Sequence, residues 1–337
     1  MFSFHCFWFI FREFQDFAGS GVVHLGGGVF ALVGAIMLGP RIGRFRPEIK
    51  GIDSPGIVGH SIPLVSLGAF ILVFGFFAFN GGSQAAISSP GDGLAVARAV
   101  VSTLVAAACG GLVVLFLVKM LPGGKWSLLK LINGMLAGES HYPASQPSSL
   151  LRRNGLHLCR MQPLWTLGSC CCLNCFRNPL CLLLQADVVI QGDLDWIPKQ
   201  PFQIDDPLDA VAVHAGAGCW GLLAAPFFVQ GGIFFGGGEA ALRMLMWNAL
   251  AGGAFIAWYA ITAVIIFGAL MVLRVFRVNE AQEIQGLDVV KHNEPAYPIG
   301  KHTLTISGLM LFSFRCVHWG RATLPHGNWC WPSAGDL

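Results

Sequence analysis

Two histidines lie deep inside long, apolar, glycine-rich segments of the chain. His24 follows Asp16 by eight residues, and His214 follows Asp209 by five. A titratable side chain at membrane depth is costly, so by default it marks a permeation or proton path rather than packing. The repeated order of an aspartate followed by a histidine predicts two helices that deliver equivalent groups to one shared site.

The segments around the histidines have the composition of an integral membrane protein. Of the 337 residues, 54% are hydrophobic and only 12% are charged, with a mean hydropathy of +0.63, whereas a soluble domain is about 25% charged. Four stretches are long enough to cross a bilayer, near 17–39, 61–82, 95–120 and 244–274, and a more polar fifth runs near 208–229. Since a span takes roughly 20 helical residues, the sequence predicts an all-α polytopic membrane protein.

Positive charge is distributed unevenly among the connections between these stretches. Connections 40–60 and 119–130 are rich in lysine and arginine, whereas 83–98 carries a single arginine. Because cytoplasmic loops carry the excess of basic residues, the first two connections are expected inside and 83–98 outside. Arg274 and Arg277 follow the last apolar stretch, so the C-terminal tail is also expected in the cytoplasm. The net charge of +3 is too small to indicate nucleic-acid binding.

Four ordered motifs and a tail are specific enough to suggest a family. They are Asp16-Phe-Ala-Gly-Ser-Gly-Val-Val-His24, Gly39-Pro-Arg-Ile-Gly-Arg-Phe45, Phe74-Gly-Phe-Phe-Ala-Phe-Asn80-Gly-Gly-Ser83, Asp205-Asp-Pro-Leu-Asp-Ala-Val-Ala-Val-His214, and the stretch from Glu283 to Tyr297. Together they resemble the ammonium transporter (Amt/Mep/Rh) family, in its plant and invertebrate Amt-like form. The resemblance implies the eleven-helix fold, with a trimer, homotrimeric or hetero-trimeric with related subunits, and one pore in each subunit. On that pattern the chain opens at the fifth helix and is a fragment without the first four.

The resemblance also implies roles for individual residues. His24 and His214 are expected to accept a proton from ammonium, or to hydrogen-bond ammonia as it passes through an apolar pore. Phe79 matches a ring that gates the outer mouth, where cation–π attraction favours an aromatic side chain. Ser83 matches a hydroxyl that helps to bind ammonium there. The neighbouring aromatic residues are interpreted as lipid-facing or core: Phe74, Phe76 and Phe77.

Asp16 has two open interpretations. In the family its position lies near the external mouth, where it organises the vestibule; alternatively it caps the following helix, because aspartate is favoured just before a helix. The two roles are compatible. Residues with expected structural or coupling roles are Asp209, which would hold helix ends together, Asn80, Gly286 and Asp288.

Between Gly138 and Phe202 both the resemblance and the membrane character disappear. Read one nucleotide later, the codons possible for Leu156 to Pro163 permit Ile-Cys-Ala-Gly-Cys-Asn, the run expected in the eighth helix of the family. We interpret 156 to about 200 as a frame-shifted exon and 139–155 as retained or mis-joined sequence, with a genuine divergent loop as the alternative. The predicted division is an unmatched 1–14, a transmembrane region 15–138 with the first histidine, the suspect 139–202, a transmembrane region 203–278 with the second histidine, a cytoplasmic tail 279–298 and an unmatched 299–337.

The suspect segment also holds six of the eleven cysteines. Cys172-Leu-Asn-Cys175 has the spacing of half a zinc site, but no second such pair accompanies it. The shifted frame explains the cluster without a metal. We therefore predict no metal site and no cofactor.

The function predicted from these residues is ammonium transport by a multi-pass plasma-membrane protein. Its expected partners are ammonium or ammonia, the lipid bilayer and related subunits, with no nucleic acid. The chain carries no Ser/His/Asp triad and no phosphate-binding motif, so it is not predicted to be an enzyme. Two alternatives remain: a membrane-embedded metal or redox enzyme, for which a third ligand at depth is missing, and a non-transporting truncated subunit that associates with intact transporters.

Overall fold

The computed structural model describes residues 14–45, 59, 61–120, 123–141, 204–229 and 231–294. Within these ranges every regular element is a helix, which agrees with the predicted all-α class. Among the described residues, five helical stretches are long and apolar enough to cross a membrane: Ser20–Leu38, Ile62–Gly82, Asp92–Met120, Val211–Phe235 and Gly238–Val272. All five predicted stretches are thus found as helices, with ends that differ by a few residues.

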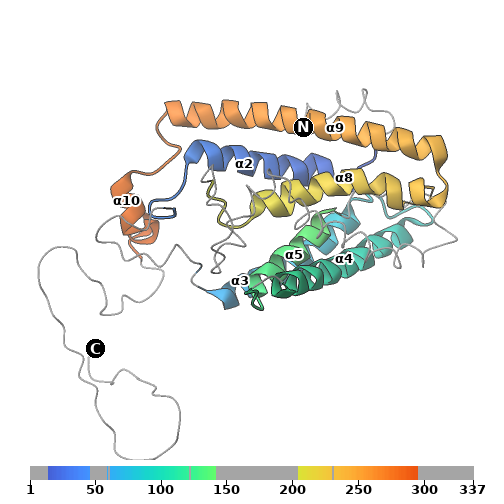
Figure 1. Cartoon of the computed structure of the whole chain (residues 1–337), viewed down its shortest axis with the longest axis horizontal. Coiled ribbons are helices and arrows are strands. Elements are labelled where there is room, and N and C mark those ends of the chain that lie inside the picture. The colour runs from blue at the N-terminus through green and yellow to red at the C-terminus, as the bar shows by residue number, and fades with distance from the viewer. Residues whose placement is uncertain are drawn as a thin grey trace, which may run out of the picture. The chain divides into compact units, whose positions relative to one another are not determined.

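The chain falls into two compact units, Met1–Ile284 and Gln285–Leu337. In the first, η1 (Ser20–Leu25) runs into α2 (Gly26–Leu38), and η4 (Val211–Gly216) runs into α8 (Ala217–Phe228). These two composite helices pack against each other and against α9 (Gly238–Val272), as Figure 1 shows. Their shared apolar core is formed by Leu25, Val29, Leu222, Ala251 and Phe255.

The fully buried Asn248 fastens the start of the chain's described part to this core. Its Nδ2 donates to the carbonyl oxygen of Leu222 at 2.9 Å, and its Oδ1 accepts from the backbone N–H of Gln15 at 3.1 Å. A buried amide is costly unless it is hydrogen-bonded. Asn248 therefore ties the residues that precede η1 to both α8 and α9.

A second group of helices packs beside the first and consists of α3 (Ile62–Gly82), α4 (Asp92–Met120) and α5 (Leu128–His141). The helix α3 begins where the Ser61 side chain accepts the backbone N–H of Leu64 at 3.4 Å, with Pro63 in its first turn. Both features favour a helix start, because proline has no N–H to leave unpaired there. A Cβ added to Gly134 of α5 would lie 2.6 Å from the carbonyl oxygen of Gly110 in α4. The backbones of α4 and α5 thus touch, as small residues allow in membrane helices.

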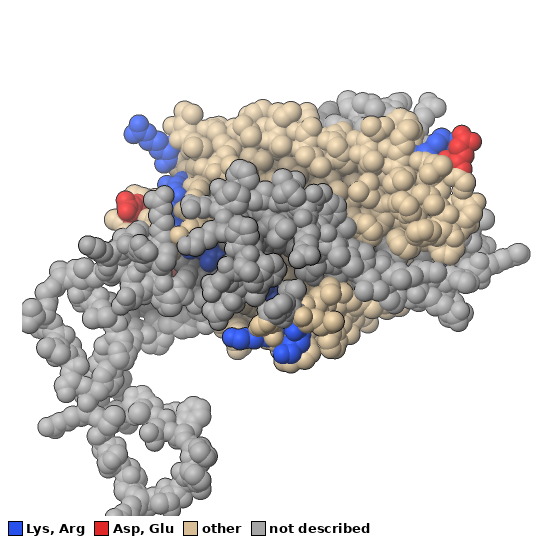
Figure 2. Space-filling model, viewed as in Figure 1, with Lys and Arg blue, Asp and Glu red and all other residues tan. Residues whose placement is uncertain are grey.

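The helix α9 is the longest described element, with 35 residues. At 1.5 Å per residue it extends about 52 Å, well beyond the ~30 Å hydrocarbon core of a bilayer. In Figure 2 the charged atoms near α9 gather at its two ends, and the length between them is tan. At its first end, Glu239 pairs with Arg243 at 2.7 Å. This distribution is that of a membrane helix whose ends reach the polar interfaces.

Candidate functional site

The two histidines meet at the crossing of the composite helices. His24 and His214 are 190 residues apart in the sequence, yet their Nδ1 atoms lie 3.3 Å from each other. The two rings are nearly parallel, at an interplanar angle of 9° and a centroid distance of 5.4 Å. An Nδ1–Nδ1 hydrogen bond requires one ring to donate and the other to accept, so between them the two Nε2 atoms present one acceptor and one donor. His24 Nε2 is buried and has no hydrogen-bond partner within the described residues.

Each histidine lies in a π-helical turn rather than in regular α-helix. In η1 the backbone N–H groups of both Val23 and His24 donate to the Gly19 carbonyl, at 2.8 and 3.0 Å, and the bond from His24 spans five residues. His214 lies in the π-helical η4 in the same way. Single π turns inside helices are rare and occur frequently at functional sites. Helical periodicity alone did not predict them.

A carboxylate precedes each histidine and accepts the free N–H groups at the start of its helix. Asp16 Oδ1 accepts from Gly19, and its Oδ2 accepts from Gly21 and Val22, at 3.0–3.1 Å. Burial raises the pKa of Asp16 to about 6, against these bonds, which lower it. These contacts are those of a helix cap, which is one of the two interpretations of Asp16 given by the sequence.

The counterpart of Asp16 in the second helix is Asp206, not Asp209 as the sequence suggested. Asp206 Oδ1 accepts from the N–H of Ala210 at 3.0 Å, and Oδ2 accepts from Val211 at 2.8 Å. The signal was present in the spacing, because Asp206 precedes His214 by eight residues, as Asp16 precedes His24.

Asp209 bonds to a different helix. Its Oδ2 accepts from Asn133 Nδ2 at 2.6 Å and from Lys130 Nζ at 3.4 Å, both on α5. Its own backbone is left-handed, with φ of 56°. Burial raises its pKa, although the charge of Lys130 opposes the shift. Asp209 therefore links the start of the His214 helix to α5.

Aromatic rings from α3 lie against His24. The Phe76 ring stacks on the imidazole at 5.7 Å with an interplanar angle of 17°, and the Phe79 ring lies 5.9 Å away at 58°. Phe76 is 7% exposed and Phe79 is 41% exposed. The core interpretation of Phe76 agrees with its burial, but its contact with His24 was missed. The signal in the sequence was the position of Phe76, about one helical turn before Phe79 and so on the same face of α3.

The remaining predicted residues of α3 do not contact the histidines directly. Ser83 Oγ donates to the Phe79 carbonyl of its own helix at 2.8 Å. Asn80 is fully buried, and its Nδ2 donates to Thr103 Oγ1 of α4 at 2.9 Å. Asn80 therefore holds α3 against α4, the helix that packs on α5.

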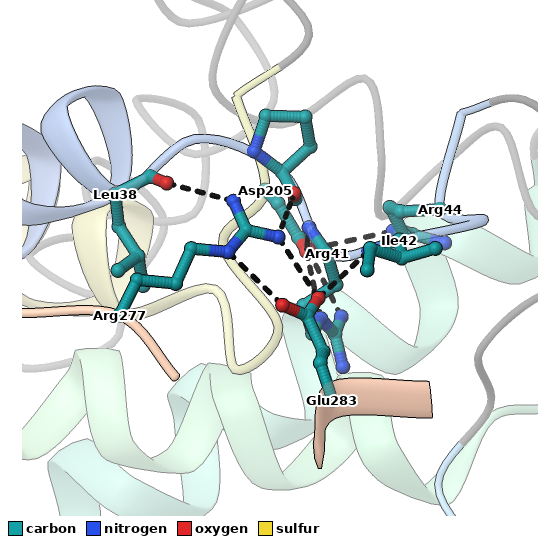
Figure 3. Close-up of polar contacts among 8 residues, drawn as sticks. Leu38, Arg41, Ile42, Arg44, Asp205, Arg277 and Glu283 are labelled. Carbon is teal, nitrogen blue, oxygen red and sulfur yellow. Dashed lines mark hydrogen bonds and ion pairs between the residues drawn. The ribbon is translucent and has the colours of Figure 1, made fainter. Parts of the chain in front are cut away.

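A polar cluster gathers where α2 ends, and Figure 3 shows its members. Arg277, which follows α9, donates to the carbonyl oxygens of Leu38 and Pro40 at 2.9 Å and forms two bonds to the Glu283 carboxylate. Glu283 also accepts the backbone N–H of Ile42 at 2.8 Å. The cluster thus joins the loop after α2 to the chain that follows α9.

Asp205 lies in the same region and links the loop after α2 to the start of the His214 helix. Arg41 donates to it through Nε at 2.7 Å, through Nη2 at 2.9 Å and through its backbone N–H at 3.0 Å. Arg44 Nε lies 3.5 Å away. Asp205 and Asp209 therefore fix the start of this helix to the loop after α2 and to α5, while Asp206 caps the helix itself.

In the second unit, Gly286 has φ of +92°, and its carbonyl accepts the N–H of Val290 at 3.4 Å. Asp288 begins η6 (Asp288–His292), and its carbonyl accepts from Glu294. The cysteine cluster and nearly all of the predicted segment 139–202 lie outside the described residues. The same holds for the unmatched chain ends and for the tail beyond Glu294.

A sequence model of the Ammonium Transporter Family matches residues 2–140 and 194–297. The chain belongs to the ammonium transporter family. The match to this family includes residues 2–14, for which the sequence alone offered no likeness, and it omits 141–193. The division of the chain proposed at 139 and 202 stays a prediction.

Individual ammonium transporters are similar to much of the chain. A Caenorhabditis elegans protein provisionally named ammonium transporter 1 is 38% identical over 300 residues, which cover 85% of this chain and 51% of that protein. Ammonium transporter 1 member 2 of Oryza sativa subsp. japonica is 31% identical over 326 residues, 88% of this chain and 59% of that protein. The chain thus spans about half to three fifths of the length of these relatives.

Solved structures of the family share the fold. A sensor Amt protein superposes with a TM-score of 0.61 at 27% identity, over 82% of this chain and 60% of its own. Candida albicans Mep2 superposes with a TM-score of 0.58 at 24% identity, over 82% and 55%. The chain is accordingly a multi-pass membrane protein with part of the ammonium transporter fold.

Proposed function

We propose that the protein containing this chain conducts ammonium across a membrane through a pore in which His24 and His214 form the central polar pair. The observation that carries the proposal is the contact between their Nδ1 atoms at 3.3 Å, on two helices that are far apart in the sequence. Membership of the family gives the expected substrate, and the protein is then a transporter rather than an enzyme.

The physical reason for such a pair is the cost of moving a charge out of water. An unpaired ammonium ion is strongly disfavoured in an apolar channel, whereas neutral ammonia is not. With one Nε2 as an acceptor and the other as a donor, the pair can take a proton from ammonium and hydrogen-bond ammonia. The proton is then relayed along the pore or returned to water at the mouth, which restores the neutral pair. The stacked Phe76 ring excludes water from one side of His24.

Recruitment at the outer mouth is assigned to Phe79, Ser83 and Asp16. The partly exposed Phe79 ring offers a cation–π surface next to His24. The Ser83 hydroxyl follows on the same helix end. Asp16 shapes the vestibule because it caps the start of the His24 helix, and its carboxylate also attracts cations.

Assembly and location follow from the family and from charge placement. We propose a homotrimer, or a hetero-trimer with related subunits, in the plasma membrane. The basic loop with Arg41 and Arg44 and the tail after Arg277 then face the cytoplasm, because basic residues are retained on that side.

Uptake of labelled methylammonium by yeast cells without their own ammonium transporters tests this function. The protein from the complete transcript is expected to restore uptake, and His214→Ala is expected to abolish it or to alter ammonium selectivity strongly. His292→Ala is the matched control, since this histidine is exposed in η6. Transport by His214→Ala equal to that of the unmodified protein would refute the twin-histidine assignment.

A second candidate function is a non-transporting subunit that associates with intact ammonium transporters. Co-expression of this chain with an intact transporter is expected to reduce uptake if it enters mixed trimers. Unchanged uptake with the chain present in the membrane would reject this function. Sequencing of the transcript across residues 130–205 and upstream of Met1 decides which form of the protein to express.

A further inference from the structure

Two glycines sit at the crossing of the histidine helices. Gly28 is in α2 and Gly218 is in α8, and each one faces the backbone of the opposite helix. A Cβ built on Gly28 would overlap with the Ala215 backbone nitrogen and lie 2.5 Å from Ala215 Cβ. A Cβ built on Gly218 would overlap with the Ser20 carbonyl oxygen and lie 2.5 Å from the Leu25 backbone nitrogen.

The two contacts are reciprocal with respect to the histidines. Gly28 follows His24 by four residues, and Gly218 follows His214 by four. Gly28 meets Ala215, the residue after His214, and Gly218 meets Leu25, the residue after His24. Since residues four apart lie on the same helix face, each glycine shares a face with its own histidine. The closest approach of the helices therefore occurs at the level of the imidazole pair.

Neighbouring glycines on the same helices have no such contact. A Cβ on Gly27 or on Gly216 would meet nothing within 4 Å. Gly21 and Gly26 face side chains, of Leu222 and Tyr259, which can adjust more readily than a backbone. Backbone contact with the opposite histidine helix thus distinguishes Gly28 and Gly218 from these four neighbours.

We propose that Gly28 and Gly218 are positioning residues that set the separation of the His24 and His214 rings, and through it the selectivity for ammonium over cations with no removable proton. The proposal rests on the proposed function. Non-bonded heavy atoms prefer separations of about 3.5–4.0 Å, so a methyl group at either glycine forces the helices apart by roughly 1 Å. The Nδ1–Nδ1 distance of 3.3 Å is already at the long end of hydrogen bonding. A further increase breaks the coupling of the two rings.

The test compares Gly28→Ala and Gly218→Ala with Gly27→Ala and Gly216→Ala in the protein expressed from its complete transcript. Methylammonium and potassium uptake are measured in the same yeast cells, together with the amount of protein in the membrane. We expect the ratio of potassium to methylammonium uptake to rise by about tenfold in the first two variants, the effect of one lost hydrogen bond. The two controls should keep the original ratio.

A double variant separates positioning from general damage. If Gly28 acts through the histidine pair, Gly28→Ala should add nothing to the altered selectivity of His214→Ala. Independent, multiplying effects would overturn the proposal, as would a ratio in Gly28→Ala equal to that in Gly27→Ala. Loss of both backbone-contact variants from the membrane, with both controls retained, would assign the glycines to folding and also overturn it. If His214→Ala itself keeps normal selectivity, the proposed function fails first.

Discussion

At the residue scale, the three aspartates before His214 show how identical side chains acquire different functions from their neighbours. Asp205 pairs with arginines of the loop after α2, Asp206 accepts the free N–H groups of its own helix, and Asp209 bonds to α5. Composition and spacing place these residues together but do not reveal the partners of Asp205 and Asp209, which lie 164 and 76 residues away in the sequence.

The ion pair of Asp205 predicts a loss of stability in acid. Burial favours a higher pKa for Asp205, but the bonds from Arg41 outweigh it and hold the pKa below its usual 3.8. A lowered folded-state pKa gives stability that is complete above the usual value and is lost as the pH falls through the folded value. Thermal unfolding in detergent should therefore show a drop below about pH 4. In Asp205→Asn this drop should be smaller, with about 1–3 kcal/mol already lost at neutral pH.

The cap formed by Asp206 gives a second prediction at this scale. Asp206→Ala should destabilise the start of the His214 helix by about 1–2 kcal/mol and lower methylammonium uptake. Asp92→Ala is the comparison variant, because Asp92 accepts the N–H of Ser89 at the start of α4, a helix that contains neither histidine. Equal uptake by the two variants at equal stability would show that the Asp206 cap has no effect on transport.

The sequence pointed to His24, His214, Asp16 and Phe79 because each belongs to a recognisable pattern, and their roles in a site stay predictions. Sequence reasoning missed the roles of Asp206 and Phe76. Nearness in the chain favours Asp209 as the partner of His214, whereas the eight-residue spacing favours Asp206, which caps the helix. Phe76 resembled its lipid-facing neighbours in type, and only the packing of α3 against His24 distinguishes it.

At the element scale, hydropathy predicted the five membrane-length helices, because apolar length alone decides whether a helix can cross a bilayer. The π turns η1 and η4 were not predictable in this way. They depend on one extra residue in a turn, stabilised by Asp16 or Asp206 and by the opposite helix. The helix α5 was also missed as an element, since it has only 14 residues and the resemblance ends near Gly138.

The contact between α4 and α5 predicts a sharp difference between two glycine variants. Gly134→Ala would place a methyl group 2.6 Å from the Gly110 carbonyl and 2.8 Å from Val114 Cβ. We expect a loss of about 1–3 kcal/mol from overpacking, measured as thermal unfolding in detergent. Gly93→Ala on α4 meets nothing within 4 Å and should be neutral. A neutral Gly134→Ala would mean that the two backbones are not in contact.

At the scale of the whole molecule, the cluster around Arg277 joins distant parts of the first unit. Arg277 and Glu283 follow α9, yet they bond to Leu38, Pro40 and Ile42 at the end of the His24 helix. These bonds connect the chain after α9 directly to the composite helix that contains His24. The motif around Glu283 suggested coupling, but its bonding partners were not readable from the sequence.

Truncation before Glu283 is expected to reduce methylammonium uptake, because it removes the carboxylate that accepts the N–H of Ile42 in the loop after α2 and pairs with Arg277. Gly286→Ala should act in the same direction, since its φ of +92° disfavours any side chain. Truncation after Tyr297, the end of the family match, is the control. Full activity without residues 283–297 would exclude this coupling.

The separation of the two histidines along the chain has a consequence for biosynthesis. Since His214 follows His24 by 190 residues, a ribosome working at about 5–20 residues per second takes roughly 10–40 s to deliver the second after the first. During that interval the face of α2 that carries Gly28 is not yet covered by the His214 helix. Lipid or the insertion machinery must shield a buried imidazole until its partner arrives, so the rate of synthesis sets how long the nascent chain is exposed to wrong pairings.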